Sequence, residues 1–207
     1  RSVRENVIAT MGTTRHEDGY LEQRRLHGLA WAASTVEGLR AIAAWGHRAN
    51  ERGRLRTGEQ LLLGVAFGEY LAQLVSALPI GQNEFVRPTD LGSEQAAAAL
   101  GAKPVVQGFI RAGNSAVNRR KLVEQLDAGW RPYEGFDDEV LDLLRDQMRS
   151  FALRRIAPFA QKWHREEALI PDEVIREMSD LSVFGVCVPA EYGGAGLDDV
   201  ACGLMMQ

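Results

Sequence analysis

The feature that most constrains the fold of this chain is an apolar stripe in its second half. From Val140 to Trp163, apolar residues recur at steps of three or four positions. This spacing places them on one face of a long helix, which must bury that face against other elements. Pro158 falls within the stripe and predicts that the helix is kinked or divided there. The stripe comprises Val140, Leu144, Met148, Ala152, Ile156, Phe159 and Trp163.

The same periodicity recurs along most of the chain, which is therefore predicted to be all-α. The segment Pro79–Gly92 is rich in turn-forming residues and is predicted to be a loop. The predicted helices cover residues 19–50, 57–78, 93–100, 104–127 and 172–181.

The predicted helix over 57–78 is apolar on a wide arc, so it needs neighbours on more than one side. Thr57-Gly58-Glu59-Gln60 has the form of a capping box, in which Thr57 caps the first turn and Gln60 reaches back. Gly64 and Gly68 lie about one turn apart, and their lack of side chains would let another helix approach closely.

A shift in charge divides the chain into two predicted domains. Residues 1–133 carry a net charge of +4 and residues 134–207 a net charge of −8. The shift coincides with the Pro- and Gly-containing segment Trp130–Gly135, which favours a boundary there. The basic excess of the first part is small and scattered, so the composition argues against nucleic-acid binding.

Composition and cysteine use predict a soluble protein of the cytoplasm. No apolar run approaches the roughly 18 residues of a membrane span, and no membrane partner is expected. Cys187 and Cys202 show no paired pattern and sit among small or apolar neighbours, so both are predicted to be buried packing residues in a reducing compartment.

The segment Val188–Asp198 is a glycine-rich loop near the end of the chain. Gly193, Gly194 and Gly196 mark a tight backbone path, and Asp198 is placed to cap a following helix. The loop matches neither a P-loop nor a dinucleotide-binding motif, so a phosphate cradle is not predicted.

No complete catalytic or metal-binding constellation is present in the sequence, so no catalytic, cofactor-binding or metal-ligating residue is singled out. His27 and His47 lack partners at ligand spacing and are interpreted as packing or surface residues. The basic cluster Arg119–Lys121 is interpreted as a solvated or interface surface. A general base among four clustered glutamates is the weaker alternative to a solvated face. These are Glu166, Glu167, Glu173 and Glu177.

Three segments in order resemble the opening of the acyl-CoA dehydrogenase family. The first segment is the end of the long predicted helix, with Phe151-Ala152 and Arg155–Pro158. The second is Ile170-Pro171-x-Glu173. The third is Phe184–Leu197, which ends in the motif P-x-E-Y-G-G-x-G-L. Ser182 stands where the family commonly has glycine, and Ala190 where it commonly has glutamate. The resemblance covers about residues 136–207. It implies a helical extension, residues 1–133, followed by an incomplete N-terminal helical domain, 134–207, truncated before the β-domain.

The extension itself resembles that of the family branch that acts on methylsuccinyl-CoA, a substrate of the ethylmalonyl-CoA pathway. The resembling segments are Leu26–Trp31, Phe67–Leu74 and Val86–Gly92. The resemblance implies a flavoprotein oxidoreductase that uses FAD to convert (2S)-methylsuccinyl-CoA to mesaconyl-CoA. It also implies electron-transfer flavoprotein as the acceptor and a homo-oligomer, with a dimer favoured.

In that family the catalytic glutamate and the flavin-contacting strands lie beyond the region that matches here. The resemblance therefore places no catalytic or FAD-binding residue on this chain, and these residues alone are expected to be inactive. The alternative is a non-catalytic helical module that serves dimerisation or docking.

Overall fold

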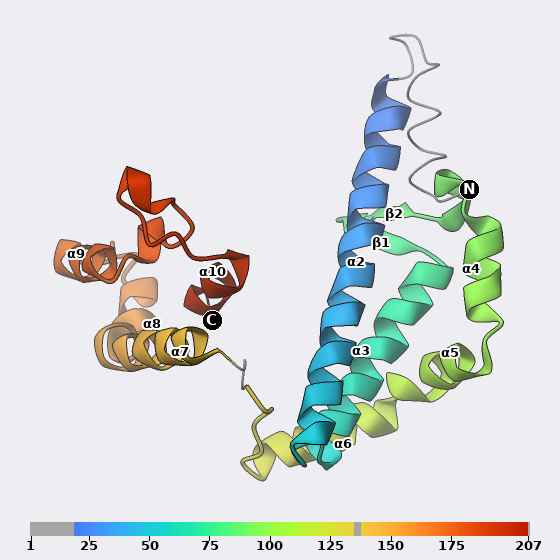
Figure 1. Ribbon diagram of the computed structural model, residues 1–207, viewed down its shortest axis with the longest axis horizontal. Coiled ribbons are helices and arrows are strands. Elements are labelled where there is room, and N and C mark those ends of the chain that lie inside the picture. Colours follow the sequence, from blue (N-terminus) through green and yellow to red (C-terminus); the bar gives the residue numbers. More distant parts are fainter. Residues whose placement is uncertain (1–18, 135–137, 207) are drawn as a thin grey trace. The chain divides into compact units, whose positions relative to one another are not determined.

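The computed structural model describes residues 19–134 and 138–206 and divides into two compact units (Figure 1). The first unit comprises Arg1–Tyr133 and the second Glu134–Gln207. Apart from one small β-hairpin, the regular structure of the described residues is helical, which confirms the predicted fold class.

The first unit is built on two packed helices, α2 and α3, which run side by side in Figure 1. A two-stranded antiparallel sheet and a series of short helices complete it. Its elements are α2 (Gly19–Glu51), α3 (Thr57–Val75), β1 (Leu78–Gly81), β2 (Glu84–Val86), the 3₁₀ turn η2 (Pro88–Leu91), α4 (Glu94–Gly101), α5 (Pro104–Gly108), the π-helical turn η3 (Phe109–Gly113) and α6 (Ala116–Asp127).

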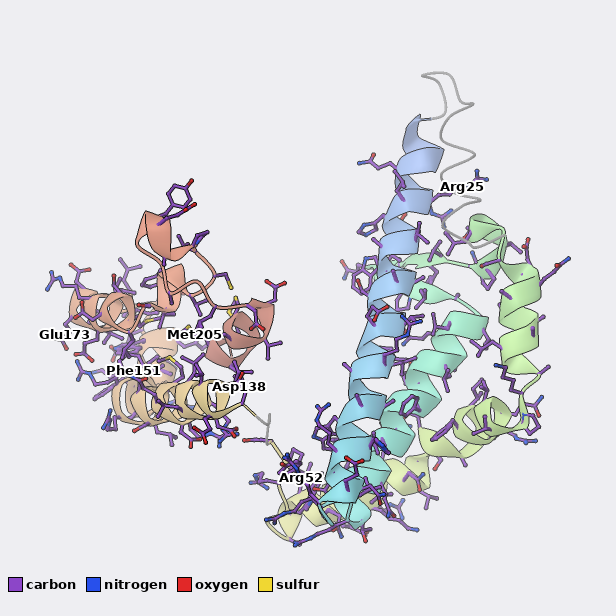
Figure 2. All side chains as sticks on the ribbon, viewed as in Figure 1. Arg25, Arg52, Asp138, Phe151, Glu173 and Met205 are labelled. Atoms are coloured by element: carbon purple, nitrogen blue, oxygen red, sulfur yellow. The ribbon has the colours of Figure 1, made fainter. Side chains whose placement is uncertain are left out.

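The second unit consists of short helices and turns, and α10 packs against α7 within it. Asp138, labelled at the start of α7 in Figure 2, caps that helix by accepting from the Val140 and Leu141 N–H groups. Its elements are α7 (Glu139–Phe151), the π-helical turn η4 (Ala152–Ile156), α8 (Ala157–Arg165), α9 (Asp172–Asp180), the 3₁₀ turns η5 (Val183–Gly185) and η6 (Ala190–Tyr192), and α10 (Asp199–Met205).

The predicted capping box of α3 was wrong by one residue. Thr57 is the first residue of the helix, and the cap is Arg56. The Arg56 N–H donates to Glu59 Oε2 at 3.1 Å, while Gln60 Nε2 donates to the Leu55 carbonyl. Glu59 is one position nearer to the cap than Gln60, and its carboxylate takes the box position that satisfies the cap N–H.

The prediction of a loop over 79–92 was also wrong. Leu78 pairs with Val86 and Pro79 with Phe85 across an antiparallel hairpin, whose turn has Asn83 in the left-handed region at φ 64°. Alternate residues point inward, so Leu78 and Ile80 are buried whereas Pro79 is exposed. With Val86 and Leu91 they form the core against α2 and α3.

The glycines of α3 allow the chain of η3 to come into backbone contact, as the spacing of Gly64 and Gly68 predicted. A methyl group added at Gly68 would lie 2.5 Å from the Asn114 nitrogen, and one at Gly113 would overlap the Gly64 carbonyl oxygen. Glu69 then accepts a hydrogen bond from Asn114 Nδ2 at 2.5 Å. Because of this close approach, the predicted single helix over 104–127 is divided into α5, η3 and α6, with Ser115 capping α6.

The end of the first unit is fastened to α3 and α2 by two tryptophan side chains. Trp130 Nε1 donates to the carboxylate of Glu59 at 3.0 Å, and its ring lies directly on Gly58. Glu59 is only 3% exposed, so this donor and the Arg56 N–H compensate for burying its charge. Trp45 Nε1, from α2, donates to the Tyr133 carbonyl at 2.8 Å.

Pro158 divides the long helix of the second unit, as its position in the stripe predicted. It lies in the first turn of α8, where a missing N–H is tolerated, and the π-helical turn η4 precedes it. The middle of the stripe is buried at Met148, but Val140 and Phe159 are 58% and 44% exposed. The second unit alone therefore covers only part of the predicted apolar face.

The contrast between Gly68 and Gly64 provides a test of the α3–η3 contact. We expect Gly68→Ala to lower the free energy of unfolding by about 1–3 kcal/mol, because its methyl group meets backbone atoms that cannot rotate away. Gly64→Ala is the matched control, since the nearest atom to its methyl group would be the Gly113 carbonyl oxygen at 3.8 Å. That change should be neutral or stabilising by up to about 1 kcal/mol through helix propensity. Both free energies of unfolding can be measured by urea unfolding followed by circular dichroism. An equal loss of stability in the two variants would contradict the contact.

The Trp130–Glu59 bond provides a second test. Trp130→Phe keeps much of the ring packing but leaves a buried carboxylate short of one donor, so it should destabilise the chain by about 1–3 kcal/mol. Trp31→Phe is the control, because Trp31 is 45% exposed and its bond to His27 is at the surface. We expect that control to change stability by less than about 0.5 kcal/mol. Far-UV circular dichroism during urea unfolding measures both, and a neutral Trp130→Phe would show that the bond does not hold this segment.

Candidate functional site

The glycine-rich loop of the second unit folds back on the segment that precedes it. Gly193 and Gly196 have φ values of 83° and 66°, in the left-handed region that favours glycine. Gly194 has no room for a side chain, because a Cβ there would overlap the Val188 carbonyl oxygen. All three glycines are thus required by the backbone path, two for conformation and one for space.

The N–H groups of this loop are used by carbonyl groups of the same unit. Five consecutive donors, from Gly193 to Leu197, each bond a carbonyl between Gly185 and Ala190, at distances from 2.8 to 3.3 Å. A diphosphate would need several of these donors unpaired and converging on one point. The loop therefore does not fit the phosphates of a flavin dinucleotide, and its geometry serves to position the helix after it.

That helix is α10, and Asp198 starts it as predicted. Asp198 Oδ1 accepts from the Val200 and Ala201 N–H groups, both at 3.1 Å. The Asp198 carbonyl oxygen accepts hydrogen bonds from the Cys187 thiol at 3.4 Å and from the Cys202 N–H at 3.2 Å. These two bonds connect the loop to the helix.

The two cysteines are unpaired, but the prediction that both are buried was wrong. Cys187 is exposed and Cys202 half-buried. Cys187 lies at the turn that enters the loop. Partial desolvation raises the pKa of its thiol above the ordinary value, and the adjacent Cys202 and the acidic Asp199 and Asp198 act in the same direction. The thiol thus stays protonated at neutral pH, which does not suit a nucleophile.

An arginine–glutamate cluster joins η4 to α9. Arg155 Nε and Nη2 each donate to Glu177 at 2.7 Å, a bidentate pair, and Nη2 reaches Glu173 at 3.4 Å. Hydrogen bonding to Glu177 raises the pKa of Arg155, so its guanidinium stays charged. Two of the four glutamates considered as bases are therefore ion-pair partners, while Glu166 and Glu167 are exposed at the end of α8.

The remaining sequence candidates are surface groups. Trp31 Nε1 donates to His27, and His47 pairs with Glu51 at 3.3 Å on the exposed side of α2. The three residues of the basic cluster Arg119–Lys121 are exposed on α6. Within the described residues no group of three His, Cys, Asp or Glu side chains is placed to hold a metal ion. The same residues contain no helix long and apolar enough to cross a membrane.

Each unit contains a hollow lined by its own residues, and sequence reasoning found neither. In the second unit a cavity of about 220 Å³ lies between α7, η4 and α10, beside Met148, Ala152 and Leu204. In the first unit a cavity of about 650 Å³ lies between α2, α3, the hairpin and α4. Both depend on how helices pack, which a periodic pattern does not specify.

Comparison with known proteins identifies the second unit. The family model described as "Acyl-CoA dehydrogenase, N-terminal domain" matches residues 138–207. A (2S)-methylsuccinyl-CoA dehydrogenase of Cereibacter sphaeroides is 39% identical over 201 residues, which cover 95% of this chain and 36% of that protein.

Other relatives match a shorter stretch. A glutaryl-CoA dehydrogenase of Desulfococcus multivorans is 40% identical over 58 residues, 28% of this chain and 15% of that protein. A 3-(aryl)acrylate reductase of Clostridium sporogenes is 36% identical over 72 residues, 35% of this chain and 19% of that protein. The chain thus spans about a third or less of the length of these relatives. Residues 138–207 belong to the N-terminal domain family of the acyl-CoA dehydrogenases, in a chain that is similar over nearly its whole length to a methylsuccinyl-CoA dehydrogenase.

Proposed function

We propose that this chain is part of an FAD-dependent acyl-CoA dehydrogenase that oxidises (2S)-methylsuccinyl-CoA to mesaconyl-CoA. One observation supports the substrate above all: the similarity to the C. sphaeroides protein runs through both units, over 95% of the chain. The glutaryl-CoA dehydrogenase and the arylacrylate reductase match over only 58 and 72 residues, about the length of the family domain. The helical first unit is therefore the feature that favours this branch of the family.

In this proposal the second unit is structural. The loop and its cap on Asp198 position α10 against α7, and the Arg155 cluster fixes α9. The five N–H groups from Gly193 to Leu197 are already paired, so we assign the flavin contacts and the base that removes the substrate's α-proton to residues outside this chain. The electron acceptor would be an electron-transfer flavoprotein and the assembly a dimer. The unpaired cysteines suit a reducing cytoplasm.

One prediction from this proposal concerns the substrate of the intact gene product. We expect that protein to carry a flavin whose visible absorption bleaches without oxygen on addition of (2S)-methylsuccinyl-CoA, because hydride transfer reduces the flavin. Glutaryl-CoA and isobutyryl-CoA serve as controls and should bleach it far more slowly. Faster bleaching by either control compound would support an acyl-CoA dehydrogenase but refute methylsuccinyl-CoA as its substrate. A gene product without flavin would instead support the non-catalytic docking module.

Another prediction from this proposal concerns the 207 residues by themselves. Since the N–H groups from Gly193 to Leu197 are paired with carbonyl groups, the isolated chain should purify without stoichiometric FAD and should not oxidise methylsuccinyl-CoA. Absorption near the flavin bands, compared with the same measurement on the intact gene product, tests this. A yellow chain with one flavin per molecule would overturn the assignment of the flavin site to other residues.

A further inference from the structure

The cavity of the first unit has the form of a ligand site that the proposed reaction does not use. Its volume of about 650 Å³ lies within the range of roughly 300–1,000 Å³ common for small-molecule pockets. Its walls come from four elements of one unit, and its floor is the buried core of Leu78, Val86 and Leu91. It is open to solvent rather than sealed, so a ligand could enter without unfolding of the unit, and its walls are mostly apolar.

Small side chains on two facing helices keep this space open. α2 contributes Ala32 and Ala33 to the lining, and α4 contributes Ala96 and Ala97. Larger aliphatic residues would be compatible with both helices and would fill the gap, yet only alanines occur at these four positions. Apolar walls exposed to water cost free energy, so an apolar guest that covers them would stabilise the unit.

The polar residues that line the cavity are few. They are Glu37, Arg40, Gln73, Arg87 and Ser93. Arg40 is already paired with Glu37 on the same helix. The guanidinium of Arg87, in contrast, has no carboxylate partner within the part of the chain that the structure describes, and its side chain is exposed. One uncompensated cation beside an apolar hollow favours a ligand with one anionic end.

We propose that this cavity binds an acyl chain with a single anionic head group, the chain against the alanines and the head group at Arg87. The methylsuccinyl group of the proposed substrate is short, and its one free carboxylate lies only a few bonds from the thioester, so it offers no long apolar chain to lie against the alanines. The site is therefore separate from the proposed reaction, and its ligand differs from the proposed substrate.

The test uses decanoate as the probe, titrated calorimetrically into the 207-residue chain and into the intact gene product. We expect saturable binding with one site per chain in both. Decanol, which lacks the carboxylate, should bind more weakly, and decanoyl-CoA distinguishes a free fatty acid from a thioester source. No binding up to about 1 mM decanoate would overturn the proposal, because a pocket of this size should reach at least that affinity. Binding by the isolated chain but not by the intact protein would show that another protein segment fills the cavity, and would also overturn it.

Two neighbouring alanines of α4 provide matched variants. Ala97→Phe fills the cavity and should weaken decanoate binding about tenfold or more, the equivalent of losing roughly 1.4 kcal/mol. Ala98→Phe places the same ring one residue further on, at an exposed position outside the lining, and should leave binding unchanged. Equal affinities for the two variants would refute the site.

Arg87→Gln tests the head group without changing the cavity. It should weaken decanoate several-fold and leave decanol unaffected, and this split holds even if Ala97→Phe fails to fold. An equal effect on both probes would refute the role of Arg87. Because none of these measurements monitors flavin or acyl-CoA oxidation, their failure is distinguishable from failure of the proposed function.

Discussion

The arrangement of the first unit depends on backbone contact between α3 and η3. Gly68 and Gly113 place the two segments closer than any side chain would allow. The hydrogen bond from Asn114 to Glu69 and the Ser115 cap then set the direction in which α6 leaves. Since α6 leads directly to Trp130, the same contact determines where the tryptophan reaches Glu59. The close approach therefore governs both the packing of the unit and the position of its last residues.

The helices of this protein were predictable because their apolar residues repeat with the helical period. The prediction succeeded where a single strong local rule applied: Pro158 ended a helix, Asp198 began one, and Gly64 and Gly68 marked a close contact. It failed where two rules competed. Glu59 and Gln60 could both complete a capping box, and only the burial of Glu59 under Trp130 decides between them.

The hairpin was missed because its strands are only four and three residues long. Leu78 and Ile80 do alternate with exposed residues, and Asn83 is a residue that tolerates positive φ, so a signal was present. It was too short to outweigh the turn-forming composition around it. The π-helical form of η3 and η4 had no such signal: Pro158 predicted a break in the long helix, but nothing in the sequence marked a π-helical turn before it or at Gly113.

Neither cavity could be predicted, because a cavity depends on the distance between helices rather than on the face that each helix presents. Alanines in α4 are equally compatible with tight packing and with an open space. Here the space stays open, because the hairpin and η2 lie between α2 and α4. The cysteines show the same limitation, since the apolar neighbours of Cys187 in sequence do not surround it in space.

Both units leave large apolar side chains at the surface, and this bears on what each can do alone. The first unit lines its open hollow with its own elements, but Val105 of α5 is 64% exposed and Val117 of α6 61%. The second unit leaves large apolar side chains at the surface: Leu143 of α7 is 69% exposed, Leu153 of η4 63% and Phe184 of η5 60%. Such a surface is costly in water and is typical of an interface. Each unit therefore presents apolar surface suited to contact with further polypeptide, and the chain spans 36% of the length of the C. sphaeroides relative.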